Sequence, residues 1–245
     1  MTSAMTTKLL ELDGVSRSFG GLMAVRTLSF SIEKGEVLGL IGPNGAGKTT
    51  IFNVINGYFP PSAGTIRFKG ERIDGRKPHQ VCLRGLARTF QVVKPLARLT
   101  VEENVMVSAF ARERRLGPAR DAALEAISFT GMDAWRETRA GSLPLGMRKR
   151  LEMARALATK PDLLLLDENF AGLNPSEVEK TIDIVRKIHE SGVTLLVIEH
   201  NMRVIMAVSN RLLAINYGEK IAEGTPQEVA NDPHVIEAYL GSAHA

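Results

Sequence analysis

Residues 37–55 read VLGLIGPNGAGKTTIFNVI, and this stretch decides the fold. Residues 42–50 match the pattern G-x-x-x-x-G-K-[ST], between an apolar run and the apolar spacing of residues 51–55. This order predicts a buried strand, a glycine-rich loop and a helix. Glycines let consecutive backbone N–H groups point inward, and the following helix adds its positive end. The stretch therefore predicts a phosphate-binding loop.

Each residue type in this loop has an expected role. The glycines allow the backbone to curl, Lys48 is expected to reach the β- and γ-phosphates, and the Thr49 hydroxyl is expected to ligate Mg²⁺. The predicted nucleotide contacts of the loop are Gly42, Pro43, Asn44, Gly45, Ala46, Gly47, Lys48, Thr49 and Thr50.

A second acidic element is expected to complete the site. Residues 163–168 read LLLLDE, which places Asp167 at the carboxyl end of a buried strand, where α/β sheets present their ligands. Asp167 is predicted to hold the Mg²⁺, and Glu168 to polarise the attacking water as a general base. An apolar run that ends in Asp-Glu is weak evidence alone, but the phosphate loop makes it strong.

The rest of the chain indicates how the elements are organised. Alternating apolar residues at 28–32 and a turn at Lys69-Gly70 make the N-terminal third rich in strands. Residues 98–139 are helical and basic in character, with Gly117-Pro118 predicted to break the run. After Pro161 the pattern returns to α/β. Asn174 is the predicted N-cap of a helix that starts at Pro175.

Composition narrows the function classes only broadly. With 44% apolar and 24% charged residues, the 245-residue chain is expected to fold into one main globular domain. A net charge of +4 permits contact with nucleic acid or an anionic membrane surface but selects neither. Cys82 is the only cysteine in the sequence, so no internal disulfide is possible. The N-terminal stretch lacks a signal-peptide pattern, and no apolar run reaches the roughly 20 residues that span a bilayer.

Several protein classes share the phosphate loop. Residues 159–162 fit the [NT]KxD pattern by which GTPases read guanine. They precede the acidic strand instead of ending a later one, and no DxxG follows, so a GTPase is rejected. A small-molecule kinase needs a lid and an acceptor site, and no segment indicates either.

The fuller set of residues resembles the ATP-binding subunits of ABC transporters over nearly the whole chain. The resemblance implies that Phe19 stacks on adenine, Gln91 contacts Mg²⁺ and water, and His200 contacts the γ-phosphate. It implies ATP and Mg²⁺ as cofactors. The implied catalytic residues are Lys48, Gln91, Glu168 and His200, and the implied metal residues are Thr49, Gln91 and Asp167. The implied dimer loop, which communicates across a dimer, is Ala171, Gly172, Leu173 and Asn174, with Asn174 where many members have Asp.

The same resemblance implies the architecture. It is an α/β fold: a RecA-like P-loop NTPase core with an antiparallel β subdomain and an inserted helical subdomain that contacts a permease. A single domain is expected over residues 1–245. The core and β subdomain are expected at about 7–95 and 158–245, and the helical subdomain at about 96–157.

One motif departs from the family. The usual LSGGQ signature points at the γ-phosphate held by the opposite subunit, and residues 143–147 here read LPLGM. Leu143 and Gly146 are kept, whereas Pro144, Leu145 and Met147 replace Ser, Gly and Gln. Proline supplies neither a hydroxyl nor an N–H, so two donors are missing. A charged hydrogen bond lost from a phosphate clamp costs roughly 1.5–3 kcal/mol, so this contact is expected to be weakened but not abolished.

The weakened motif predicts an asymmetric heterodimer. The site on Lys48, Asp167 and Glu168 borrows the signature of a partner ATPase and is expected to be competent. The companion site borrows LPLGM. The alternative is that LPLGM functions adequately in both sites, which also allows a homodimer.

Longer stretches resemble a narrower group, the branched-chain amino-acid importers, and within it the longer of two paired ATPase subunits. They are residues 39–66, 85–105 and 217–241. The resemblance implies two membrane permeases, an extracytoplasmic solute-binding protein, a peripheral position on the cytoplasmic face of the inner membrane, and no nucleic-acid partner.

Three alternatives stay open at this point. The same group includes importers of urea, amides and aromatic acids. A soluble ABC ATPase that acts on DNA or ribosomes suits the basic charge but usually needs a coiled-coil insertion or two tandem cassettes. A nucleotide-binding subunit that no longer hydrolyses ATP is disfavoured by Glu168 and His200.

Overall fold

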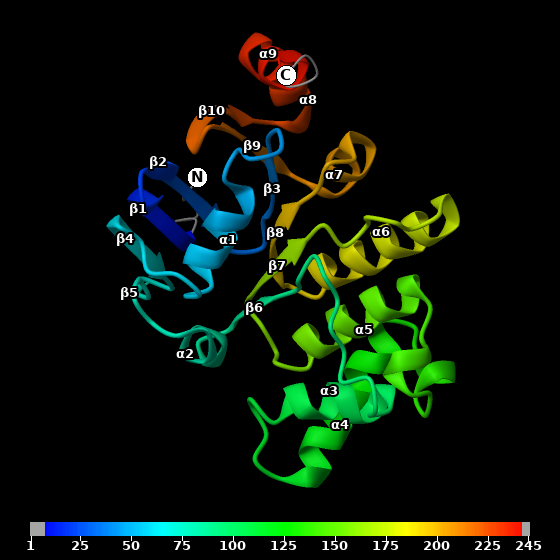
Figure 1. Cartoon of the computed structure of the whole chain (residues 1–245). Helices are drawn as coiled ribbons and strands as arrows, with labels where there is room; N and C mark the ends of the chain where they lie inside the picture. The colour runs from blue at the N-terminus through cyan, green and yellow to red at the C-terminus, as the bar shows by residue number, and fades with distance from the viewer. Residues whose placement is uncertain (1–7, 242–245) are drawn as a thin grey trace, which may run out of the picture.

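The computed structural model describes residues 8–241 and contains two β-sheets flanked by helices (Figure 1). A four-stranded antiparallel sheet has the order β2-β1-β4-β5, and a six-stranded sheet has the order β10-β9-β3-β8-β7-β6. Residues 1–7, which belong to the stretch without a signal-peptide pattern, and residues 242–245 of the predicted domain lie outside the described residues. The strands are β1 (Lys8–Phe19), β2 (Leu22–Glu33), β3 (Val37–Ile41), β4 (Ala63–Phe68), β5 (Glu71–Arg72), β6 (Leu86–Arg88), β7 (Leu163–Asp167), β8 (Thr194–Ile198), β9 (Arg211–Asn216) and β10 (Glu219–Gly224).

The six-stranded sheet is buried on both faces at its centre. Strands β3, β7 and β8 are parallel, and all of their residues are buried. Along β3, Leu38 and Leu40 join an apolar cluster with α1 (Lys48–Ile55) and the antiparallel sheet. Val37 and Ile41 join a second cluster with α6 (Pro175–Glu190) and α7 (Met202–Val208). The period of two thus explains why these strands are apolar throughout.

This arrangement positions the predicted site. The phosphate loop, residues 42–50, leaves the carboxyl end of β3, and Asp167 ends the parallel strand β7 two positions away in the sheet. Between them, β8 leads into His200. Because parallel strands end at one edge, all three segments meet there. The predicted strand, loop and helix of residues 37–55 are confirmed.

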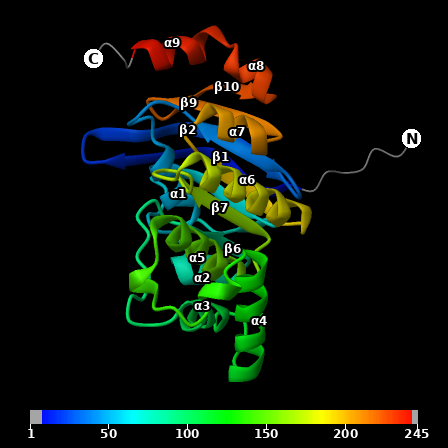
Figure 2. The ribbon, with the colours of Figure 1, turned by 90° about the vertical axis from the view of Figure 1, so that its right-hand side faces the viewer.

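A third apolar cluster belongs to helices α3 (Val101–Ala109), α4 (Leu116–Phe129) and α5 (Leu145–Leu157), which lie below the sheets (Figure 2). The short 3₁₀ segments Asp133–Trp135 and Ala140–Ser142 join α4 to α5. The prediction that Gly117-Pro118 breaks the helical run was wrong. The break falls at residues 110–115, and Pro118 lies in the first turn of α4, where a backbone N–H has no intrahelical partner to lose.

Arg112 bridges the helical layer to the core. It lies between α3 and α4, and its guanidinium donates to the carbonyl oxygens of Thr159 (2.8 Å), Leu83 (2.8 Å) and Cys82 (3.4 Å). Leu83 and Cys82 form the end of α2 (Pro78–Leu83), and Thr159 follows α5. One member of the basic run is therefore structural and does not face solvent freely.

The cap of α6 agrees with the sequence pattern. Asn174 Oδ1 accepts from the N–H of Glu177, and a Glu177 carboxylate oxygen accepts from the N–H of Asn174, both at 3.0 Å. These two bonds satisfy donors that the helix start would leave unpaired. The chain continues through α8 (Pro226–Ala230) to α9 (Pro233–Gly241). Among residues 8–241, no helix has the length and apolar character needed to cross a bilayer.

Candidate nucleotide-binding site

The phosphate loop needs glycine at two positions for steric reasons. Gly42 and Gly47 have φ angles of 154° and 105°. A Cβ atom at Gly47 would lie 2.4 Å from the carbonyl oxygen of Ala24, and one at Gly42 would lie 2.2 Å from that of Ile215. The backbone can follow this path only without side chains, as the sequence pattern predicts.

Lys48 lies inside the curl of the loop. Its Nζ donates to the carbonyl oxygens of Gly42 (2.6 Å) and Pro43 (2.9 Å). Burial lowers the pKa of Lys48, while the charges of Glu168 and Asp167 oppose that shift. The loop is also supported from far along the chain, because the N–H of Gly42 donates to Tyr239 Oη on α9 at 2.9 Å.

Two other predicted catalytic residues, Gln91 and His200, contact the carboxylate of Glu168. One carboxylate oxygen accepts from Gln91 Nε2 at 2.5 Å, and the other lies 2.5 Å from His200 Nε2. The Glu168 backbone is in the left-handed region, with φ of 50°. Its N–H donates to the carbonyl oxygen of Ile198 at 3.0 Å, and its own carbonyl accepts from Lys149 Nζ at 2.7 Å. The carboxylate is thus held from two sides at the sheet edge.

Asp167 has a different environment. It is buried, and its Oδ2 accepts from Arg88 Nη2 at 2.7 Å. Arg88 also donates to Asn53 Oδ1 at 2.6 Å. Burial raises the pKa of Asp167, and the bond and charge of Arg88 oppose that rise. Arg88 was not predicted from the sequence, although an arginine at the end of the apolar run Leu86-Ala87 is a signal for a buried partner.

A cavity of about 470 Å³ collects most of the predicted residues. It does not include Asp167, whose carboxylate turns toward Arg88. Tyr217, which was not predicted as a site residue, also lines the cavity. The signal in the sequence is an aromatic residue in the turn before Gly218. The predicted residues on its wall are Phe19, Asn44, Gly45, Ala46, Gly47, Lys48, Thr49, Thr50, Gln91, Glu168 and His200.

Phe19, Thr49 and Gln91 can be compared with what adenine and Mg²⁺, the ligands that the resemblance implies, would need. Phe19 is 39% exposed. Its ring packs edge-on against Phe59, with 5.2 Å between the ring centroids, and the Arg17 guanidinium lies 4.6 Å from its centroid. It is therefore held in place with part of its surface accessible. Thr49 and Gln91 offer oxygen donors of the kind that Mg²⁺ prefers. Within residues 8–241, no group of three His, Cys, Asp or Glu side chains could hold a metal ion.

The signature, residues 143–147, lies outside this cavity. Pro144 is the N-cap of α5 and gives no side-chain cap bond. Leu145 is 47% exposed and packs near the dimer loop, residues 171–174: a Cβ at Gly172 would lie 2.9 Å from Leu145 Cδ2. A Cβ added at Gly146 would lie 2.6 Å from Glu177 Oε1, in the first turn of α6. The structure thus brings signature and dimer loop together, away from the chain's own phosphate loop.

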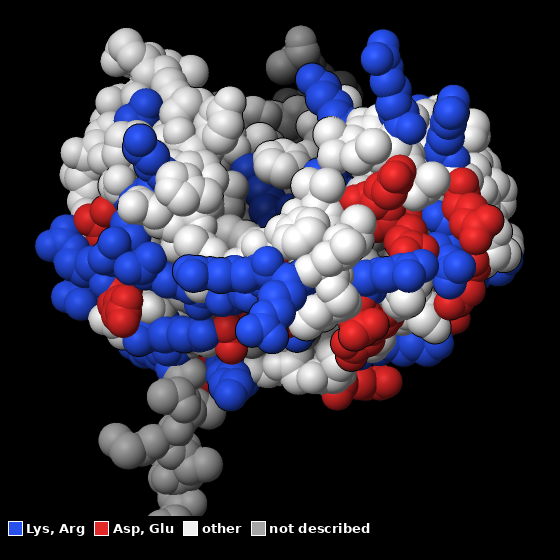
Figure 3. Space-filling model, turned by 90° about the horizontal axis from the view of Figure 1, so that it is seen from below, with Lys and Arg blue, Asp and Glu red and all other residues white. Residues whose placement is uncertain are grey.

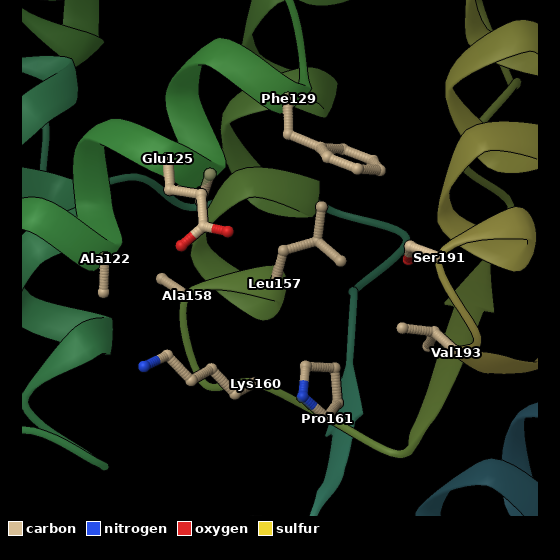
Figure 4. A pocket seen from close by; sticks show the side chains of 10 residues that line it. Ala122, Glu125, Phe129, Leu157, Ala158, Lys160, Pro161, Ser191 and Val193 are labelled. Carbon is tan, nitrogen blue, oxygen red and sulfur yellow. The ribbon is translucent and has the colours of Figure 1, made fainter.

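Another cavity, of about 320 Å³, lies between α4, the end of α5 and the turn after α6 (Figure 4). Phe129, Leu157 and Val193 give it apolar walls, with Glu125 and Lys160 at the side. It contains none of the predicted site residues.

Comparison with known proteins gives two family matches. A family model described as ABC transporter matches residues 25–171. A model described as branched-chain amino acid ATP-binding cassette transporter matches residues 219–245.

Individual relatives match over nearly the whole chain. The chain is 38% identical to the high-affinity branched-chain amino acid transport ATP-binding protein BraF of Pseudomonas aeruginosa, over 98% of this chain and 100% of that protein. It is 36% identical to LivG of Escherichia coli K12, which has the same description, over 98% and 100%. It is also 36% identical to the lipopolysaccharide export system ATP-binding protein LptB of Escherichia coli K12, over 95% and 97%.

Solved structures agree with the fold. An ATP-binding cassette of an ABC transporter in its ADP conformation superposes with a TM-score of 0.88 at 30% identity, covering 96% of this chain and 100% of that one. A nucleotide-free cassette gives 0.87 at 30% identity, covering 95% and 98%.

Proposed function

Because the chain belongs to the ABC transporter family of ATP-binding proteins, we propose that it hydrolyses ATP to drive uptake of branched-chain amino acids or a related small solute. One observation carries the ATPase part: Lys48, Gln91, Glu168 and His200 converge on one cavity beside the phosphate loop. The solute class is supported by the match at residues 219–245 and by BraF and LivG. Urea, amide and aromatic-acid importers of the same group remain the alternative. The similar identity to LptB makes export the second candidate.

The side chains divide the chemistry between them. Glu168 takes a proton from the attacking water, and Gln91 and His200 hold its carboxylate in place. Lys48 and the loop amides stabilise charge that develops on the transferred phosphoryl group. Thr49, Gln91 and Asp167 would hold Mg²⁺, which neutralises phosphate charge when bound. Asp167 would have to share its carboxylate with Arg88.

The basic surface does not favour a nucleic-acid partner. Seen from below, Lys and Arg side chains gather on the left and centre of the molecule, and acidic ones on the right (Figure 3). Several basic residues in β5 or directly after β4 and α2 are already paired with carboxylates. The pairs are Lys69–Asp162 (2.5 Å), Arg72–Asp74 (2.8 Å) and Arg84–Glu71 (3.4 Å). We therefore propose partners that are proteins, not nucleic acids.

The helical layer is the proposed contact with two membrane permeases. A pocket of about 270 Å³ opens between α2, β6 and α5. Exposed apolar side chains lie in its wall or next in sequence to it, namely Phe90, Leu83 and Val107. This supports a helical subdomain of about 96–157 that docks to the permeases where it meets the core, at the cytoplasmic face of the membrane. A core and β subdomain of about 7–95 and 158–245 would bind the nucleotide.

The signature supports an asymmetric pair of cassettes. Pro144 caps α5 without a side-chain bond, and Leu145 presents an exposed apolar surface where the family has glycine. We propose that this chain pairs with a second ATPase subunit and that its LPLGM contributes a weak contact to the partner's nucleotide. A homodimer in which LPLGM serves both sites is the alternative.

The assembled transporter provides the test. The chain is combined with its partner ATPase, two permeases and the solute-binding protein in proteoliposomes, and ATP hydrolysis and labelled leucine uptake are measured together. Glu168→Gln is expected to abolish most of both, because it removes the proposed base. The exposed Glu190→Gln on α6 is the matched control. Unchanged hydrolysis in Glu168→Gln would refute the assignment. Greater damage from the partner's equivalent glutamate would refute the asymmetry.

A further inference from the structure

Lys149 is a buried cation on the first turns of α5, close to the predicted catalytic glutamate. Its side chain is only 3% exposed, which is rare for lysine. Nζ donates to the backbone carbonyl of Glu168 at 2.7 Å. The contact joins residues 19 positions apart, from a helix of the helical layer to the end of β7.

The surroundings of Lys149 are acidic. Four carboxylates interact electrostatically with its charge: Glu152 on α5, Asp167 and Glu168 at the end of β7, and Glu199 at the end of β8. Asp167 has its own cation in Arg88, and Glu199 accepts from the N–H of Phe170 at 2.9 Å. The specific bond of Lys149, however, is to the neutral carbonyl of Glu168. Its position therefore fixes a peptide group and does not simply pair a charge.

That peptide group needs support. Glu168 has φ of 50°, a conformation that residues other than glycine adopt at a cost and that persists only where neighbours hold it. Two bonds do so: its N–H to the Ile198 carbonyl and its carbonyl to Lys149. With the backbone in this conformation, the carboxylate meets Gln91 and His200. Loss of the bond at the carbonyl would remove one of the two supports of this backbone conformation, on which the direction of the carboxylate depends.

We propose that Lys149 is a positioning residue for Glu168, fixing the backbone so that the carboxylate is aimed at the water that attacks ATP. The proposal rests on the proposed role of Glu168. It also gives α5 two tasks. The helix presents the signature at its first residues and, one turn later, holds the base of the chain's own site. When the two subunits close on the partner's nucleotide, a movement of α5 would then act directly on the position of Glu168.

The first experiment measures ATP hydrolysis by the assembled transporter with Lys149→Met, which keeps an unbranched apolar side chain but removes the donor. We expect kcat to fall about tenfold to a hundredfold, because displacing a reacting group by about 1 Å has effects of this size. KM for ATP and the affinity for a fluorescent ATP analogue should stay within about twofold, since Lys149 does not line the cavity. Lys149→Arg, which keeps a donor, should lose less.

Arg150→Met is the matched control on the same helix. Its guanidinium lies toward Gly131 in the helical layer, with Nη1 3.7 Å from a Cβ added there. This substitution also removes one positive charge from α5. We expect kcat within about twofold of the unmodified protein. An equal loss in Arg150→Met and Lys149→Met would overturn the proposal, because it would show a general effect of charge.

A double-mutant cycle separates positioning from a structural effect. If Lys149 acts through Glu168, then Lys149→Met should cause no further loss in a Glu168→Gln background. Multiplied losses would overturn the proposal. If Lys149→Met does not fold, Lys149→Leu serves instead, because leucine also has no donor. Unchanged kcat in Glu168→Gln would refute the proposed function, whereas unchanged kcat in the Lys149 variants alone would refute only this inference.

Discussion

Replacing Glu152 with glutamine is expected to stabilise the protein in a way that depends on pH. Glu152 lies on α5 and is 6% exposed. Oε1 accepts from the N–H of Phe90 at 2.9 Å, and Oε2 has no hydrogen-bond partner among the described residues. Burial raises the pKa of Glu152 to about 7, and the Phe90 N–H, Arg155 and Lys149 oppose the rise. Its charged form is therefore poorly accommodated, and an amide can keep the bond to Phe90.

The magnitude follows from the two pKa values. The ordinary value is 4.5 and the folded value about 7. The folded protein binds this proton more tightly than the unfolded chain, so protonation of Glu152 contributes to the free energy of unfolding. This contribution is fully present below pH 4.5 and is lost progressively as the pH rises to 7. Above pH 7 no further stability is lost. Each pH unit of difference is worth about 1.4 kcal/mol, so the loss is about 3 kcal/mol. Glu152→Gln does not lose this stability, because glutamine has no ionisable side chain.

Urea unfolding at pH 5, 6, 7 and 8, followed by the fluorescence of Trp135, measures the effect. The free energy of unfolding of Glu152→Gln minus that of the unmodified protein should increase from pH 5 to pH 7 and then level off. Glu190→Gln, an exposed carboxylate on α6, should show no such trend. A difference that stays constant with pH would refute the reasoning, because it would mean that Glu152 is charged throughout this range.

Three further changes test the site and its scaffold. Gly47→Ala should weaken binding of a fluorescent ATP analogue at least tenfold, since its Cβ would lie 2.4 Å from the Ala24 carbonyl oxygen. Gly45→Ala, also at positive φ but without a close contact, should lose less affinity. A larger loss in Gly45→Ala than in Gly47→Ala would contradict the steric argument. Asn174→Ala should lower the free energy of urea unfolding by about 1 kcal/mol through loss of the helix cap, with no change on Asn174→Asp; an unaltered midpoint in Asn174→Ala would show that the cap is dispensable. Phe19→Ala should raise the Kd for ATP several-fold while Phe19→Tyr retains the affinity; equal affinities would remove Phe19 from adenine binding.

The local signals were readable from the sequence. Residues 42–50 form the expected loop, and Asn174 caps the expected helix, because each feature depends on neighbours within a few positions. The acidic strand end was also found, since an apolar run that ends in a carboxylate is visible without knowledge of the sheet. What these signals could not give was the direction in which a side chain turns. Asp167 was predicted to face the metal, and its carboxylate bonds to Arg88.

The missed residues depend on long-range order. Lys149 reads as one of several cations in RKR, and only the packing of α5 under β7 makes it a buried donor. Tyr217 reaches the cavity because β9 lies next to β3 in the sheet, so that the turn from β9 to the edge strand β10 lies beside the phosphate loop; no local pattern specifies this strand order. Gly117-Pro118 misled for the opposite reason: the residues are frequent in breaks, but here they start a helix.

Arg112 determines where the two layers can pivot. Its single guanidinium donates to the final carbonyls of α2 and to the carbonyl of Thr159, two residues after the end of α5. A swing of the helical layer about an axis through this group leaves all three tethers intact, whereas a sliding displacement stretches them together. We therefore expect the core and the proposed permeases to be coupled by a rotation of the helical layer about Arg112. The displacement caused by this rotation increases with distance from Arg112, toward the far end of α4.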